Sequence, residues 1–203
     1  GFRLVGGKIA FLERHLDRLY EGAAAIDLDI GMDRVALAGA LYRTVTANDM
    51  SEGVHIRLMV TRGIKRTPNQ DPRYTLGAAT IVIVAEWKEP NPEVKRKGLR
   101  LFTATVRTTP PDMFDMRINS HSRLPLITAL IQALKAGADE ALMLDPHGFV
   151  ASCNATNFFI VRRGEVWTST GRFSFNGITR ANVIALAQAN GIPMLQKDFT
   201  LAE

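Results

Sequence analysis

The stretch that decides the fold runs from Arg117 to Arg180 and reads RINSHSRLPLITALIQALKAGADEALMLDPHGFVASCNATNFFIVRRGEVWTSTGRFSFNGITR. In its first part, 124–136, apolar side chains recur at helical spacing, which predicts an amphipathic helix. Two short apolar strands follow, ALMLD at 141–145 and NFFIV at 157–161, with a DPHG turn after the first. The stretch closes on GITR at 177–180, a glycine turn entering a helix, where backbone N–H groups can bind a phosphate.

The remaining residues predict an α+β protein of two lobes. Two short strands around Gly6-Gly7 form a hairpin, because such turns require positive φ. The proline- and charge-rich segment 88–97, KEPNPEVKRK, is the predicted linker between a lobe at 1–90 and a lobe at 98–203. The strand at 79–87 is nearly all apolar, so we expect it in the centre of its sheet. Further helices are expected at 12–26, from Asp33 to about 45 and at 180–190, and further strands at 54–61, 99–106 and 194–199.

The composition argues against several classes of protein. With 203 residues and 46% apolar content, the chain can bury one large core or two small ones. No apolar run is long enough to predict a membrane span. The single cysteine, Cys153, allows no internal disulfide framework, and we expect a cytoplasmic protein. The only dense basic cluster, at 95–100, is too narrow to predict nucleic-acid binding despite a net charge of +5.

The order and spacing of these pieces resemble the fold-type IV pyridoxal-phosphate enzymes, which comprise branched-chain aminotransferases, D-amino-acid aminotransferases and aminodeoxychorismate lyases. The matching pieces are the helix before GADEALMLDPHGFV, the loop ending in NFF at 157–159, the GITR turn, and FLERHLDRL at 11–19. The resemblance covers essentially the whole chain and implies the family's two-lobed α+β fold, truncated at both ends in this sequence. It also implies pyridoxal 5'-phosphate as cofactor, an amino acid or 2-oxo acid as substrate, and a homodimer.

The same resemblance assigns the residues around the cofactor phosphate. It places the phosphate at Gly177, Ile178 and Thr179, with Asn157 in the adjoining loop. Arg18, in the H-x-x-R-L motif of the first lobe, is expected to reach the same phosphate, a contact that suits a guanidinium fork. The ordinary alternatives are a helix N-cap at Thr179 and a surface ion pair for Arg18 on its own helix.

Candidate residues for the substrate carboxylate lie at the end of the strand at 54–61. Arg62 precedes Gly63 at that point, where loops commonly form the rim of a pocket. By resemblance, the loop that follows carries the residues that receive the carboxylate, which makes Lys65 and Arg66 candidates as well.

Two positions depart from the family pattern. Counting back from Gly137, the Schiff-base lysine falls at Asn119, whose amide nitrogen is not nucleophilic. The glutamate that keeps the ring nitrogen protonated, five residues before Asn157, is replaced by Ser152, whose hydroxyl carries no charge. We therefore expect non-covalent cofactor binding and an impaired or diverged amino-group transfer.

Other functions stay open beside this one. The first is a catalytically silent protein that binds a phosphorylated ligand in the same fold. The second is a lyase resembling the aminodeoxychorismate enzymes, against which Asn119 counts equally because they use the same lysine. A thiol hydrolase built on Cys153 and His121 is conceivable, but a lone cysteine beside a strand end is more often a small buried hydrophobic residue. The four histidines lack H-x-x-x-H spacing, so no metal site is predicted.

Overall fold

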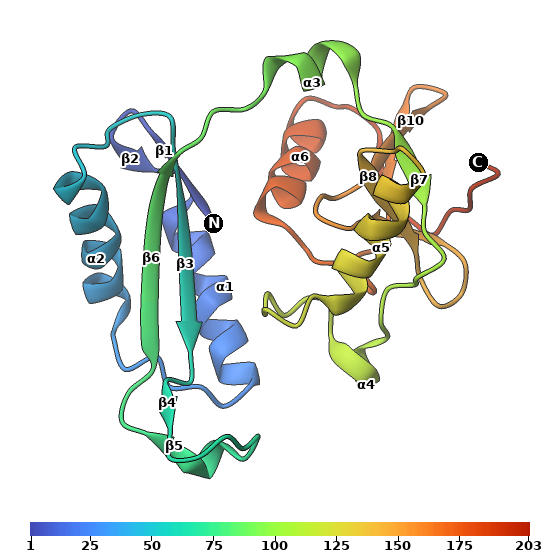
Figure 1. Cartoon of the computed structure of the whole chain (residues 1–203). Coiled ribbons are helices and arrows are strands. Elements are labelled where there is room, and N and C mark those ends of the chain that lie inside the picture. Colours follow the sequence, from blue (N-terminus) through green and yellow to red (C-terminus); the bar gives the residue numbers. More distant parts are fainter. The chain divides into compact units, whose positions relative to one another are not determined.

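The computed structural model describes residues 1–203 and divides into two compact units, Gly1–Asn91 and Pro92–Glu203. Figure 1 shows the elements of both units along the chain. The division falls within the predicted linker, whose second half is the short helix α3 (Pro92–Lys97). Among all these helices, none combines the length and the apolar content that a membrane crossing requires.

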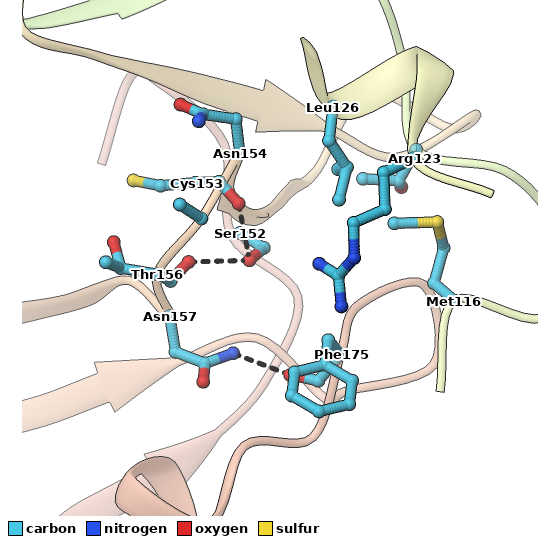
Figure 2. Close-up of a pocket in the computed structure, with 11 residues that line it drawn as sticks. Met116, Arg123, Leu126, Ser152, Cys153, Asn154, Thr156, Asn157 and Phe175 are labelled. Carbon is cyan, nitrogen blue, oxygen red and sulfur yellow. Dashed lines mark hydrogen bonds between the residues drawn. The ribbon is translucent and has the colours of Figure 1, made fainter. Parts of the chain in front are cut away.

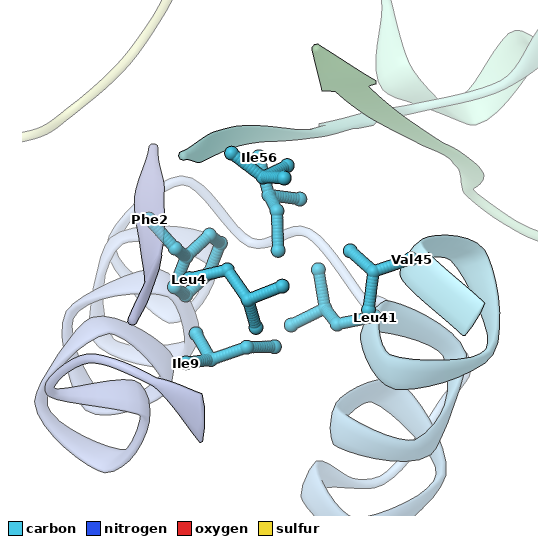
Figure 3. Packing of buried hydrophobic residues seen from close by; sticks show 7 residues of the cluster. Phe2, Leu4, Ile9, Leu41, Val45 and Ile56 are labelled. Carbon is cyan, nitrogen blue, oxygen red and sulfur yellow. The ribbon is translucent and has the colours of Figure 1, made fainter. Parts of the chain in front are cut away.

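The first unit is an antiparallel sheet packed against two helices. The sheet has the order β2-β1-β3-β6, and a two-stranded hairpin, β4-β5, follows β3. The core brings together side chains of β1, β2, β3 and α2, among them Phe2, Leu41 and Ile56 (Figure 3). The bounds are β1 Phe2–Val5, β2 Lys8–Ile9, α1 Leu12–Ala25, α2 Arg34–Ala47, β3 Val54–Thr61, β4 Ile64–Lys65, a 3-10 turn Pro72–Tyr74, β5 Thr75–Leu76 and β6 Thr80–Trp87.

The predicted local features of this unit are confirmed, with one correction. Asp33 caps α2, because its carboxylate accepts from the backbone N–H of Ala36 at 2.7 Å. The strand at 80–87 is an edge strand that pairs only with β3, so its predicted central position is wrong. One face of β6 packs into the core, whereas Val82 and Val84 on the other face are 38% and 46% exposed. The apolar residues on both faces of this strand indicated that both faces are buried. In this unit, however, the core covers only one face of the strand.

The second unit contains two three-stranded sheets. In the first, β7-β8-β9, the outer strand β7 is parallel to β8 and β9 is antiparallel to it. In the second, β10-β11-β12, the last strand is parallel to β11. The bounds are β7 Leu101–Thr103, α4 Pro111–Phe114, α5 Leu124–Lys135, β8 Glu140–Leu144, β9 Val150–Cys153, β10 Phe159–Arg162, β11 Glu165–Thr168, α6 Ile178–Ala189 and β12 Met194–Gln196.

Small side chains let α5 lie close to the first of these sheets. Ala129 and Ala133 of the helix are fully buried against Ala141 and Met143 of β8. At the end of β8, Asp145 Oδ1 accepts from the N–H groups of His147 and Phe149, both at 2.9 Å, which fixes the predicted DPHG turn. The chain therefore returns as β9 beside β8, and β9 forms one wall of the pocket described below.

Candidate functional site

A pocket in the second unit lies among the start of α5, the end of β9 and the segment before α6 (Figure 2). It brings together two of the residues predicted from the sequence, Ser152 and Asn157. The full lining consists of Thr108, Met116, Arg123, Leu126, Ser152, Cys153, Asn154, Ala155, Thr156, Asn157 and Phe175.

The wall formed by β9 and the loop after it is fixed by its own hydrogen bonds. The Ser152 hydroxyl lies 2.9 Å from the carbonyl oxygen of Thr156 and 3.0 Å from that of Cys153, and donates its proton there. Buried Asn154 exchanges two hydrogen bonds with the backbone of Ala141, at 2.8 and 3.0 Å. The wall is therefore rigid, and the Ser152 proton is directed to the backbone.

The start of α6 adjoins this wall through Asn157. The Asn157 amide donates to the carbonyl oxygen of Phe175 at 2.8 Å (Figure 2). A Cβ atom on Gly177 would lie 2.7 Å from Asn157 Oδ1, so the close approach needs a glycine. Gly177 is also the N-cap of α6 and supplies no side-chain cap, which leaves the N–H groups of the first turn without a side-chain acceptor. Thr179 is the second residue of the helix, so the alternative in which it is the N-cap is wrong.

Arg180, the last residue of the GITR turn, anchors the first turn of α6 to the second sheet. Its side chain is only 6% exposed, and its Nη2 donates to the carbonyl oxygen of Ser169 at 2.6 Å and to Gln196 Oε1 at 2.9 Å. Burial lowers the pKa of Arg180 from its usual value. Sequence reasoning assigned no role to this residue, and an arginine directly after a glycine turn gives no signal of burial.

On the α5 side of the pocket, the predicted lysine position is occupied by an exposed amide next to an arginine. Asn119 Oδ1 accepts a hydrogen bond from Arg123 Nη2, and Arg123 Nε donates to the carbonyl oxygen of Ser120 at 3.0 Å. The Arg123 side chain points into the pocket (Figure 2) and is the only charged side chain that lines it. No lysine lines the pocket. No pattern in the sequence predicts the direction of the Arg123 side chain, because that direction depends on the local fold.

The thiol in the pocket wall is poorly suited to nucleophilic chemistry. Cys153 is 5% exposed. Burial, together with the nearby charge of Glu140, raises the pKa of Cys153 to about 11. The thiol is therefore protonated at neutral pH, and His121 is not among the lining residues. Both observations argue against the hydrolase alternative.

The first unit carries the remaining residues predicted from the sequence. Arg18 Nη2 lies 3.3 Å from His15 Nδ1, and the His15 ring packs on Phe2 with 4.7 Å between ring centroids. Burial, followed by the charge of Arg18, lowers the pKa of His15 to about 4, so this histidine is neutral at pH 7. Arg18 therefore has an uncharged neighbour on its own helix.

The three candidates for the substrate carboxylate are placed around the end of β3. Arg62 donates to the backbone carbonyl oxygens of Asp27, at 2.7 Å, and Ile26, where it satisfies the C-terminal end of α1. In the β4-β5 hairpin, Lys65 donates to the carbonyl oxygen of Asn69, and the side chain of Arg66 is exposed.

Comparison with known proteins identifies the family. Residues 1–203 match the family described as Amino-transferase class IV. The chain is 37% identical over 203 residues to branched-chain-amino-acid aminotransferase-like protein 1 of Arabidopsis thaliana, covering 100% of this chain and 36% of that protein. It is 35% identical over 202 residues to the putative branched-chain-amino-acid aminotransferase of Methanocaldococcus jannaschii, covering 99% and 68%. It thus spans about a third of the length of the plant relative.

Solved structures confirm the predicted fold. A branched-chain amino acid aminotransferase from T.th. with pyridoxamine 5'-phosphate superposes with a TM-score of 0.89 at 27% identity, over 99% of this chain and 66% of that one. The branched-chain aminotransferase of Thermoproteus uzoniensis with norvaline gives 0.89 at 30% identity, over 99% and 68%. The sequence match over the full length and the superposition agree, and the chain belongs to the class IV aminotransferase family.

Proposed function

We propose that this chain binds pyridoxal 5'-phosphate reversibly, and that its amino-group transfer between an amino acid and a 2-oxo acid is impaired. The observation that carries the proposal is the composition of one pocket. Its lining includes Asn157, which adjoins the glycine-led start of α6, but includes no lysine. The site is therefore equipped to bind a phosphate and is not equipped to bind an aldehyde covalently.

The proposed place for the phosphate group of the cofactor is the start of α6, which adjoins the pocket wall at Asn157 but does not line the pocket itself. Ile178 and Thr179 begin a helix of 12 residues whose first turn has no side-chain cap. Their N–H groups and the partial positive charge of the helix start favour an anion there. Gly177 keeps the helix start in contact with Asn157. Arg18 of the first unit is the proposed second cation for this phosphate.

The reacting part of the cofactor does not fit the residues present. Pyridoxal phosphate serves as an electron sink when its carbonyl carbon is linked to an amine and its ring nitrogen is protonated. Asn119 offers no nucleophilic amine, and the Ser152 hydroxyl donates to backbone carbonyl oxygens and carries no charge. No catalytic step through the cofactor is therefore assigned to this chain.

The proposed substrate and partners rest on the membership of this chain in the family. The names of the plant and archaeal relatives support a branched-chain amino acid or its 2-oxo acid. Arg62, Lys65 and Arg66 are the proposed contacts for its carboxylate. A cytoplasmic homodimer completes the proposal.

A spectroscopic titration of the purified full-length protein tests this function. We expect pyridoxal phosphate to bind reversibly, and borohydride reduction followed by intact-mass measurement to give no adduct. A reduced adduct mapped to one lysine would overturn the reversible binding. Robust transamination by the same protein would overturn the impaired activity.

Two substitutions and one control locate the phosphate. Thr179→Ala and Arg18→Gln should each weaken pyridoxal phosphate binding by about three- to tenfold, since each removes one hydrogen-bonding group of the proposed site. Gln188→Ala, on the exposed last turn of α6, should leave the affinity unchanged. Unchanged affinity in both test variants would remove the phosphate from this location.

A further inference from the structure

The pocket carries a buried hydroxyl that has no hydrogen-bond partner within the protein. We propose that Thr108 donates this hydroxyl proton to the ring nitrogen of the bound cofactor, and that the site holds this nitrogen in its unprotonated form. A pyridine ring without a proton on its nitrogen withdraws electrons less strongly, so the same contact contributes to the impaired amino-group transfer. This inference rests on the proposed function, since it concerns the same bound ligand.

The burial of the Thr108 hydroxyl is the first argument. Thr108 lines the pocket and is 2% exposed, and its Oγ1 has no hydrogen-bond partner. Its backbone N–H donates to the carbonyl oxygen of Leu144 at 3.0 Å, which fixes the residue in the wall. A desolvated hydroxyl without a partner is unfavourable, and a polar ligand atom beside it would relieve that cost. Thr108 therefore indicates a ligand with a polar atom at this wall.

The second argument is that the other hydroxyl protons of the lining are already used. The Ser152 hydroxyl, predicted to face the ring nitrogen, donates to backbone carbonyl oxygens at 2.9 and 3.0 Å (Figure 2). The Thr156 hydroxyl donates to Glu140 Oε1 at 2.8 Å. An unprotonated pyridine nitrogen is an acceptor and needs a donor. Of the hydroxyl groups in the lining, that of Thr108 is the one whose proton is free for this contact.

The charges around the pocket are the third argument. A protonated ring nitrogen is a cation, which burial disfavours unless a carboxylate lies beside it. The lining contains no Asp or Glu, and its titratable side chains are Arg123 and Cys153. A guanidinium carries no negative charge, and burial, with the nearby charge of Glu140, raises the pKa of Cys153 to about 11, so the thiol stays protonated. Glu140 itself lies outside the lining and accepts from Thr156. The pocket therefore favours a neutral ring nitrogen.

Two ligands that differ only at the ring nitrogen test the contact on the full-length protein. They are pyridoxal 5'-phosphate and its 1-deaza analogue, in which a C–H group replaces the nitrogen. Calorimetric titration should give about three- to tenfold tighter binding of pyridoxal phosphate, as expected for one hydrogen bond. In Thr108→Val this preference should fall below about twofold, with the affinity for the deaza analogue nearly unchanged.

Two further variants separate the contact from folding. Thr108→Ser keeps the hydroxyl and should retain most of the preference. Thr46→Val makes the same change as Thr108→Val at an exposed threonine of α2, outside the pocket, and should leave both affinities unchanged.

The protonation state is measured with pyridoxal phosphate that carries nitrogen-15 in its ring. The bound ligand should give the nitrogen chemical shift of an unprotonated pyridine. It should keep this shift as the pH falls from about 8 to about 6, because the pocket disfavours the charged form of the ring. The shift of a protonated ring in the bound ligand would overturn the unprotonated form, and loss of that shift in Glu140→Gln would assign the nitrogen to Glu140.

The remaining outcomes contradict specific parts of the proposal. Equal affinities for pyridoxal phosphate and its deaza analogue in the unaltered protein would overturn the contact and leave phosphate binding intact. A preference that survives in Thr108→Val would assign the nitrogen to another donor. If neither ligand binds, the proposed function fails. The Thr108 contact is then judged with 3-hydroxy-2-methylpyridine alone, whose NMR-detected binding must disappear in Thr108→Val for the contact to stand.

Discussion

The α6 side and the α5 side of the pocket are built from different kinds of groups. On the α6 side, the proposed anion site consists of backbone N–H groups at a helix start, next to Gly177. On the α5 side, Asn119 occupies the position at which the sequence predicts the family's lysine, and Arg123 is the residue that reaches the pocket. A site made of backbone tolerates many side-chain changes, whereas a covalent link depends on one side chain. We infer that ligand binding and covalent chemistry can be separated in this fold.

The largest effect is expected from restoring an amine on the α5 side with Asn119→Lys. The new amine would lie beside the Arg123 guanidinium, which lowers the pKa of the lysine and favours its nucleophilic form. The protein should change from no reducible adduct to about one adduct per chain with pyridoxal phosphate. Absorption spectra, borohydride reduction and peptide mapping measure this change.

The matched control for that variant is Ser122→Lys, which adds a lysine at an exposed position of the same segment. It should give no specific adduct. If Asn119→Lys also gives none while reversible binding persists, Asn119 does not face the ligand, and the two sides differ for another reason.

The second effect is expected on the α6 side from Gly177→Ala. The backbone of Gly177, at φ −64°, suits any residue, so the effect is steric. The added Cβ would meet Asn157 Oδ1, and Asn157 could move only by giving up its bond to Phe175. We expect a loss of about 1–2 kcal/mol of unfolding free energy and at least about tenfold weaker phosphate binding.

Urea unfolding and ligand titration measure those two quantities. The control is Gly22→Ala in the last turn of α1, where an added Cβ meets no atom. That substitution should stabilise the protein by up to about 1 kcal/mol, because alanine is the better helix former. Normal phosphate binding by Gly177→Ala would show that the start of α6 need not lie against Asn157.

The sequence predicted the glycine turn and the helix that follows it because these signals are local. A glycine before a helix, with its spacing from the strands at 140–162, is visible without knowledge of the fold. The same holds for α5 and for the Asp145 turn, whose hydrogen bonds join residues at most four positions apart.

The features that the sequence did not predict depend on contacts between distant segments. Arg123 and Thr108 line one pocket although 15 positions separate them, and no pattern marks the direction of either side chain. The strand β6 was misplaced because apolar composition reports the residues of a strand and not its neighbours in the sheet. The sequence could mark Asn119 as the expected lysine position, but it could not predict the contact of Asn119 with Arg123.

A smaller effect is expected in the pH dependence of stability, and it comes from His15. This residue is the neighbour of Arg18, the proposed phosphate contact outside this pocket. The pKa of His15 is lowered to about 4, chiefly by burial, so the folded state resists its protonation. The unfolded chain protonates near its ordinary pKa of about 6.5, so this contribution to stability is complete above that pH and is lost as the pH falls from 6.5 towards 4. With allowance for solvent screening, the loss is about 1–2 kcal/mol.

NMR titration of the histidine ring and urea unfolding at several pH values check this prediction. His15→Gln should weaken the pH dependence between 6.5 and 4. A His15 resonance that titrates near pH 6.5 would contradict the neutral state and place Arg18 beside a partly charged neighbour.

The smallest effect is expected from Thr108→Val, which sharpens the comparison on the α5 side. The substitution keeps the shape of the side chain and removes a buried hydroxyl without a partner. The unliganded protein should gain about 1 kcal/mol of unfolding free energy, because no hydrogen bond is lost and a desolvated polar group is removed.

The counterpart is Thr168→Val, at a threonine that is equally buried but donates to the carbonyl oxygen of Phe158 at 2.7 Å. There the same substitution leaves a carbonyl oxygen without its partner and should cost about 1–3 kcal/mol, so the two threonines should respond with opposite signs. If Thr108→Val destabilises the protein to the same extent, the Thr108 hydroxyl is already satisfied in the unliganded pocket.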